Sequence, residues 1–319
     1  MRSSLRRQLA HLAAVALLLC AAAAVSRAQS YLPPWGPPPP GGGVTFAVPP
    51  FDEIADLYGD VVDPQLTIFF GGNQFMVVPD LVAAFKRAYP RYTRVFVETL
   101  PPGKLASQIE SGALIMGSLR IDAKPDVYTA GRAQIGELQR QKRWFAGTYD
   151  YAANELAIMV RAGNPRRIKS LADLGRRDVR VSMPNPTFEG IARQIAAALR
   201  KAGGESLERT VMQTKVADGS TILTEIHHRQ SPLNILEGRA DAAPVWATES
   251  YFQEHVLHFP VQTVTIPAAQ NARATYTAGV LAAAPHPQAA RDFLAFLATA
   301  EAQEIYRRYG FAPPSPPSR

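Results

Sequence analysis

The chain has 319 residues, of which 47% are hydrophobic, 9% aromatic and 19% charged. This composition is too apolar for a disordered chain, and the mean hydropathy of -0.08 is too low for a protein with several membrane spans. The net charge of +7 by itself favours a nucleic-acid partner, whereas a single cysteine, Cys20, excludes a disulfide framework and a CxxC metal or redox site.

The N-terminal residues have the three-part pattern of a secretory signal peptide. Three arginines precede an uncharged run from residue 12 to residue 25, and Ser-Arg-Ala at 26–28 suits signal peptidase. We expect residues 1–28 to be a cleaved signal, with a retained anchor as the alternative. Cleavage leaves 30 basic and 27 acidic residues, a net charge of +3. No nucleic-acid partner is therefore expected, and the mature chain is predicted to be a soluble, monomeric, periplasmic protein.

Proline-rich segments flank the main body. Residues 29–50 contain runs of Pro and Gly that cannot pack a core, so they are interpreted as a tether. Residues 313–319 are rich in Pro and Ser and are predicted to be a loose tail. The acidic stretch at 51–63 is expected to lie on the surface of the main body.

Strands and helices alternate between these segments. In chain order the patterns predict a strand at 65–70, a helix at 77–89, a strand at 93–99, a helix at 104–111, strands at 126–129 and 156–160, a helical turn at 170–174, a strand at 179–182, a helix at 187–202, a strand at 240–246, a helix at 248–255, strands at 261–266 and 277–283, and a helical hairpin or long helix at 287–309. Pro79 is expected to kink the first helix or to place its start near Val78. The alternation predicts an α/β architecture with largely parallel sheets.

Four junctions between a strand and the next helix carry small or capping residues. In open parallel sheets, ligands bind at the carboxyl ends of strands, where helix N-termini offer unpaired N–H groups to an anion. Each junction alone is usually only a turn or a cap, but the four together predict a site. They are Gly71-Gly72-Asn73-Gln74, Pro101-Pro102-Gly103-Lys104, Asn185-Pro186-Thr187, where Asn185 or Thr187 is the expected helix cap, and Thr248-Glu249-Ser250.

Several motifs follow one another in the order of a known family. They are the strand, loop and helix at 66–89, the helix at 104–112, Pro125-Asp126-Val127-Tyr128, the segments at 154–160 and 170–174, and most specifically Gly238-Arg239-Ala240-Asp241-Ala242 with Val245-Trp246, and the C-terminal helix at 289–311. Residues 66–311 thereby resemble the type II periplasmic solute-binding proteins of ABC importers, nearest to the molybdate/tungstate-binding group.

The resemblance implies a two-lobed clamp, each lobe a mostly parallel sheet flanked by helices, with the ligand in the cleft between lobes. Its expected parts are lobe 1 at 65–152, lobe 2 at 153–259 and a return to lobe 1 at 260–312, with crossings near 152–154 and 259–262. In such a clamp an oxyanion is held by backbone amides and neutral side chains. Carried over by motif position, and with Gln74 added from the first loop, the ligand-binding residues are Gly72, Asn73, Gln74, Gly103, Lys104, Asn154, Asn185, Thr187 and Trp246.

The function expected from this resemblance is capture of a small anion, first of all a molybdate- or tungstate-like oxyanion, for an ABC importer whose membrane permease is the partner. The first loop lacks the serine that is usual in the family, and Lys104 adds a positive charge. The same backbone amides and side-chain donors therefore also suit another oxyanion or a small carboxylate. The alternative function is an extracytoplasmic sensory or assembly partner that uses the same clamp.

Two other classes of function are weaker. The mature chain has no G-x-S-x-G, H-E-x-x-H or P-loop pattern, so no enzyme activity and no cofactor are expected. His227 and His228 are weak candidates for a metal site, because the side chains of adjacent residues diverge and cannot chelate one ion together.

Overall fold

The computed structural model describes residues 56–116, 119–187, 189–225 and 230–314. The predicted signal peptide and tether lie outside these ranges, as do residues 315–319 of the predicted tail. Within the described ranges, no helix has both the length and the hydropathy needed to cross a membrane.

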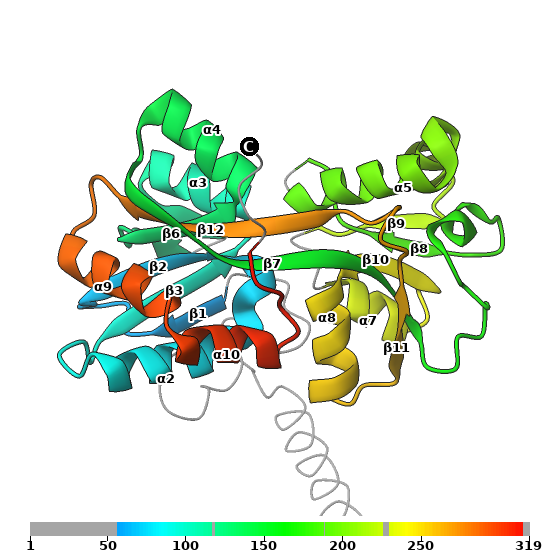
Figure 1. Cartoon of the computed structure of the whole chain (residues 1–319). Helices are drawn as coiled ribbons and strands as arrows, with labels where there is room; N and C mark the ends of the chain where they lie inside the picture. Colours follow the sequence, from blue (N-terminus) through cyan, green and yellow to red (C-terminus); the bar gives the residue numbers. More distant parts are fainter. Residues whose placement is uncertain (1–55, 117–118, 188, 226–229, 315–319) are drawn as a thin grey trace, which may run out of the picture.

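One ten-stranded mixed sheet runs through both halves of the molecule (Figure 1). Its strand order is β1-β3-β2-β6-β12-β7-β10-β8-β9, and β11 also pairs with β7. The strands are β1 (Asp56–Gly59), β2 (Leu66–Gly71), β3 (Val95–Leu100), β6 (Val127–Gly131), β7 (Phe145–Arg161), β8 (Val181–Met183), β9 (Thr221–Leu223), β10 (Ala242–Trp246), β11 (Val261–Thr265) and β12 (Arg273–Leu281). A separate hairpin is formed by β4 (Leu114–Met116) and β5 (Leu119–Ile121).

Helices cover the sheet in both halves. They are the 3-10 helix η1 (Gly72–Val77), α2 (Val78–Ala88), α3 (Pro102–Ser111), α4 (Arg132–Lys142), η2 (Leu171–Gly175), α5 (Gly190–Arg209), η3 (Thr210–Thr214), α6 (Lys215–Ala217), α7 (Gln230–Leu236), α8 (Ala247–Tyr251), η4 (Phe252–Val256), α9 (Pro287–Leu297) and α10 (Ala300–Arg308). Figure 1 shows α2, α3, α4, α9 and α10 on one half and α5, α7 and α8 on the other.

The two halves are joined by long strands. The first part of β7, up to Glu155, pairs antiparallel with β12 in the first half, and its last part, from Leu156, pairs with β10 on one side and β11 on the other. β7 and β12 therefore run side by side across the middle of the molecule (Figure 1). Only the second part of β7 was predicted, because its buried apolar run, unlike the partly exposed first part, has a clear strand pattern.

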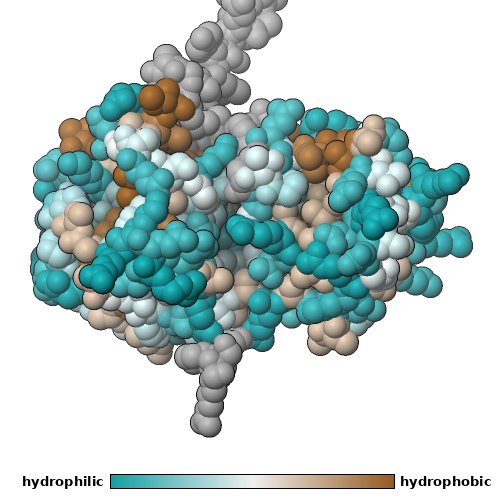
Figure 2. Space-filling model, turned by 90° about the horizontal axis from the view of Figure 1, so that it is seen from above, coloured by the Kyte–Doolittle hydropathy of each residue, from teal (hydrophilic) through white to brown (hydrophobic). Residues whose placement is uncertain are grey.

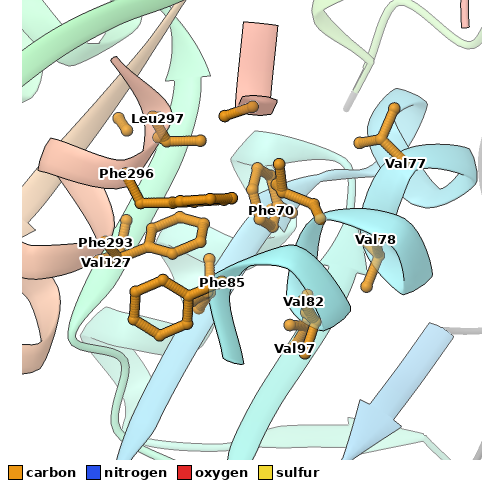
Figure 3. Close-up of a cluster of buried hydrophobic side chains, with 14 of the residues drawn as sticks. Phe70, Val77, Val78, Val82, Phe85, Val97, Val127, Phe293, Phe296 and Leu297 are labelled. Atoms are coloured by element: carbon orange, nitrogen blue, oxygen red, sulfur yellow. The ribbon is translucent and has the colours of Figure 1, made fainter. Parts of the chain in front are cut away.

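Each half has its own hydrophobic core. In the first half, Phe70 of β2 and Phe85 of α2 pack against Phe293 of α9, with ring centroids 6.1 and 5.3 Å apart (Figure 3). Burying one such side chain contributes about 1.5–3 kcal/mol. In the second half, β7, β8 and β10 pack against η2 and the apolar side of α5. The C-terminal helices thus complete the first core, although the second half lies between them and β2 in sequence.

The α/β class is confirmed, but the sheet is more mixed than predicted. Parallel pairing is confined to β3-β2-β6 in the first half and β10-β8-β9 in the second. The crossing strands β7 and β12 and the edge strand β1 pair antiparallel. The chain crosses to the second half along β7 and returns along β12, so these two strands pair antiparallel. The alternation of strands and helices in the sequence does not reveal such pairs.

The predicted return to the first lobe at residue 260 is too early. β11 pairs with the last part of β7, and Ile266 and Ala272 are buried in the core of the second half. The chain returns along β12 instead. Pro313, the first residue of the predicted loose tail, is held in place, because its O accepts a hydrogen bond from Arg273 at 2.9 Å, next to Ala312, which pairs with Ala153 of β7.

Several helix boundaries follow the sequence signals. α2 begins at Val78, with Pro79 in its first turn, as one of the two alternatives predicted. α5 loses helical geometry at Gly203 and Gly204, where its end was predicted, but the chain resumes a helix up to Arg209. The predicted hairpin at the C-terminus is confirmed as α9 and α10.

Gly279→Ala is expected to destabilise the protein by about 1–3 kcal/mol, the usual range for overpacking a core. A Cβ atom at Gly279 of β12 would lie 2.3 Å from Cδ1 of the buried Phe145 ring. Urea unfolding measures the change. The control is Gly147→Ala in the neighbouring strand, where a Cβ meets nothing within 4 Å; its stability should be unchanged or slightly higher. Equal stability of the two variants would contradict this description of the packing.

Candidate functional site

A cavity of about 490 Å³ lies between the two halves. The first half contributes η1, the start of α3 and one side of α4; the second contributes the start of α5 and the end of β10; the crossing strand β12 contributes Ala274 and Tyr276. The face that Figure 2 shows is hollowed between the halves and mostly hydrophilic around the hollow. This volume is within the usual range for small-molecule sites.

Two helix N-termini from opposite halves meet at this cavity. Gly131, Ala133 and Gln134 of the α4 start line one wall, and Gly190 and Ile191 of the α5 start line the other. Neither helix has a side-chain cap or an acidic residue in its first turn within the described chain. The first N–H groups of a helix have no partner inside the helix, so these walls offer N–H donors and partial positive charge.

The N-terminus of α3 lies beside the N-termini of α4 and α5. Its N-cap, Pro101, and its first residue, Pro102, line the cavity, and the chain before it passes close to the first loop: a Cβ at Gly72 would lie 3.2 Å from the carbonyl carbon of Leu100. Proline has no N–H, so α3 adds its dipole here but few donors.

The floor of the cavity is a buried polar network. The Asn73 amide of η1 donates to the Tyr276 hydroxyl, and Asn154 Nδ2 of β7 lies 3.4 Å from the same oxygen and 2.8 Å from Thr248 Oγ1. The Trp246 ring packs edge-on against Tyr276, with centroids 6.0 Å apart. Neutral groups thus fill the base of the cleft, where an unpaired buried charge would be costly.

Charged side chains stand at the cavity walls. Arg193 of α5 is exposed, and it forms no ion pair with any of the described residues. Lys142 of α4 pairs with Glu110. The Glu189 carboxylate accepts from Asn185 N at 3.0 Å and from the Thr224 hydroxyl, so it is held by a loop of its own half.

The structure brings only some of the predicted site residues to this cavity. Gly72, Asn73 and Trp246 line it, and Asn154 supports its floor. Gly103, Lys104 and Thr187 line a second hollow of about 440 Å³ on the other side of the α3 N-terminus. Pro101 and Pro102 line the first cavity, whereas Gly103 and Lys104, which follow them directly, line the second hollow.

Two predicted ligands have structural roles. Gln74 is fully buried in the first half, where its Oε1 accepts from the Tyr151 and Tyr306 hydroxyls at 2.7 and 3.1 Å. Asn185 closes its own loop: Oδ1 accepts from Thr187 N at 3.0 Å, and Nδ2 donates to Thr224 O. Neither Asn185 nor Thr187 caps α5, because the helix begins later and Glu189 is its N-cap.

Sequence reasoning missed α4 and Tyr276. The α4 sequence has a weak apolar pattern, with only Ile135 and Leu138 buried, and Gly136 lowers its helix propensity. Gly131, two residues after the end of the predicted strand at 126–129, is the one available signal. Tyr276 stands one residue before the predicted start of its strand, and nothing local marks it as a cavity residue.

No group of three or more His, Cys, Asp or Glu residues suited to a metal ion occurs among the residues that the structure describes. His227 and His228 lie outside them. A metal site at these histidines stays a prediction.

Two α/β halves joined by crossing strands, with a cavity over a polar floor between them, define the chain as a two-lobed binding protein. The family model of the bacterial extracellular solute-binding proteins matches residues 66–312, and the chain belongs to this family. The family is one of transport proteins of the ABC-importer type, in agreement with the resemblance found in the sequence.

Individual relatives differ in what their names say they bind. The molybdate-binding protein ModA of Mycobacterium tuberculosis is 26% identical over 212 residues, which are 66% of this chain and 70% of the relative. Among solved structures, a periplasmic molybdate-binding protein of Azotobacter vinelandii has a TM-score of 0.63 at 15% identity, covering 78% of this chain and 100% of that one. The sulfate-binding protein SubI of M. tuberculosis has a TM-score of 0.62 at 22% identity, covering 79% and 87%. Iron-bound HitA of Pseudomonas aeruginosa has a TM-score of 0.59 at 16% identity, covering 80% and 90%. At these identities the structures establish the fold alone.

Proposed function

We propose that this protein captures a small anion, first of all a molybdate- or tungstate-like oxyanion, in the cavity between its lobes and delivers it to the membrane permease of an ABC importer. Residues 1–28 would be the export signal, residues 29–50 a tether, and the mature protein periplasmic. The lobes would consist of residues 65–152 with 273–312, and of residues 153–272.

The observation that carries this proposal is the meeting of the α4 and α5 N-termini at one cavity. An anion between them is bound by N–H groups of both lobes, whereas an open protein offers it only one set. Ligand therefore favours the closed state, because only that state provides all donors. Arg193 adds a positive charge, and the neutral floor binds without a counter-ion.

The ligand's identity is the finer part of the proposal. Backbone N–H groups bind an anion according to its charge and shape, and they do not identify the element at its centre. The relatives named for molybdate and sulfate support a tetrahedral oxyanion. A small carboxylate fits the same donors, and the iron-bound neighbour makes ferric iron a necessary member of any ligand panel.

Thermal unfolding of residues 29–319 against a ligand panel tests this function. The panel contains molybdate, tungstate, sulfate, phosphate, small carboxylates, ferric iron and divalent metals. An anion present at 100 times its Kd stabilises a protein by about 2.7 kcal/mol, which raises the Tm of a chain of this length by roughly 4–5 °C. We expect such a rise with at least one oxyanion. A rise with metals alone would contradict the proposal.

A further inference from the structure

Tyr276 occupies a special position in the cleft. It belongs to the crossing strand β12, not to a helix or loop of either lobe, and it lines the cavity with only 5% of its surface exposed. Its ring is held edge-on between Trp246 and Phe311, with centroids 6.0 and 6.1 Å away. The hydroxyl therefore has a fixed place at the base of the cavity.

The lone pairs of this hydroxyl are already used. Asn154 Oδ1 accepts from Glu155 N at 3.0 Å, which fixes the orientation of the amide and turns its Nδ2 toward Tyr276. Asn73 Nδ2 approaches the same hydroxyl from the first lobe. A phenol oxygen that accepts from two amides retains only its own O–H to donate.

The Tyr276 proton has no acceptor among the described residues, although the side chain is almost completely buried. A buried donor without a partner is unfavourable, and the open direction left to it is the cavity that Tyr276 lines. We propose that the Tyr276 hydroxyl donates a hydrogen bond directly to the bound anion. This inference rests on the proposed function and adds a ligand-contacting residue to it.

The proposal also narrows the class of ligand. A hydroxyl that can only donate needs an acceptor, and an ionised oxygen of an oxyanion or carboxylate accepts a stronger hydrogen bond than a protonated ligand oxygen does. Burial raises the pKa of Tyr276 far above its usual value, so the group remains a neutral donor throughout the physiological range. Recognition at this point favours the fully ionised oxygen of a ligand over a protonated one.

Tyr276→Phe tests the contact by isothermal titration with molybdate and sulfate as probes. The variant keeps the ring and removes the O–H. We expect affinity to fall about ten- to hundredfold, the effect of losing a hydrogen bond to a charged group. The matched control is Tyr151→Phe, which also removes a buried tyrosine hydroxyl, but one that donates to Gln74 away from the cavity. Its affinity should equal that of wild type.

A double-mutant cycle with Asn73→Ala separates direct contact from positioning. If Tyr276 acts only by holding Asn73, its substitution has no further effect once the Asn73 amide is gone. Direct donation predicts that Tyr276→Phe still weakens binding in the Asn73→Ala background. A wild type that binds neither probe, nor any other anion of the thermal-unfolding panel, would overturn the proposed anion-binding function and this inference with it. A wild type that binds, with Tyr276→Phe unchanged or silent in the Asn73→Ala background, would overturn this inference alone.

Discussion

Gly190→Asp is expected to lower anion affinity at least a hundredfold while leaving the protein as stable as wild type or slightly more so. Gly190 is the first residue of α5 and lines the cavity, and a Cβ atom there meets nothing within 4 Å. A carboxylate at a helix N-terminus stabilises the helix by about 0.3–1 kcal/mol. The same charge repels an anion in the cavity, by about 4 kcal/mol for two unit charges 4 Å apart at an effective dielectric constant of 20.

Gly190→Asp is expected to lower anion affinity without lowering stability, so the experiment distinguishes loss of the binding site from misfolding. A misfolded variant loses both stability and binding, whereas this variant should lose binding alone. Gly190→Asn is the matched control, because it has nearly the same size without the charge, and its affinity should stay within about tenfold of wild type. Titration calorimetry and thermal unfolding measure the two quantities. Equal anion affinity of the Asp and Asn variants would show that the ligand does not bind at the α5 N-terminus.

Glu98→Gln is expected to stabilise the protein above neutral pH by up to about 3 kcal/mol. Glu98 of β3 is fully buried, and its Oε2 accepts a hydrogen bond from Gln108 Nε2 at 2.9 Å. Burial raises the pKa of this carboxyl from 4.5 to about 7, with the Gln108 hydrogen bond opposing the shift. A shift of this size corresponds to about 3 kcal/mol between the two protonation states.

The sign of this pH dependence follows from the number of protons that Glu98 binds in the folded and unfolded states. Between pH 4.5 and 7 the folded protein keeps a proton on Glu98 that the unfolded chain has released, so the free energy of unfolding falls as pH rises through this window. Below pH 4.5 the carboxyl is neutral in both states, and Glu98→Gln should change little. Above pH 7 the wild type buries a charge, whereas the glutamine variant does not.

Urea unfolding of wild type and Glu98→Gln from pH 4 to pH 9 measures this difference. The stability gain of the variant should appear between pH 4.5 and 7 and then level off. Glu205→Gln, which removes an exposed carboxyl from α5, is the control for the loss of one negative charge. Parallel pH profiles for Glu98→Gln and wild type would contradict the raised pKa.

Local signals predicted most of the fold. The compact apolar runs at β2 and β10 and the helix boundaries near Pro79 and Gly203 each depend on a few neighbouring residues, so the sequence reveals them. The first part of β7 and the helix α4 depend instead on tertiary pairing and burial. Their sequences have mixed polarity, and only the surrounding sheet makes a strand or a helix of them.

The candidate site was harder to predict for a similar reason. Every strand–helix junction offers a helix N-terminus, but the sheet order decides which of them meet. The junctions at Asn73 and Trp246 reach the cavity, whereas Lys104 and Thr187 lie in a neighbouring hollow. Tyr276 comes from a crossing strand, which the usual rule about the carboxyl ends of parallel strands does not consider.

The crossing strands also set the order in which the lobes can acquire structure. The aromatic core of the first lobe joins Phe70 and Phe85, early in the chain, to Phe293 and Phe296 near its end. Until α9 has been synthesised, this core lacks the rings of Phe293 and Phe296, whereas the second lobe is continuous in sequence from β7 to β11. Contacts between distant segments form slowly, because closing a long loop costs conformational entropy before the stabilising contacts between its ends have formed. We therefore expect the second lobe to fold first, and the core of the first lobe to be completed only after α9 has been synthesised.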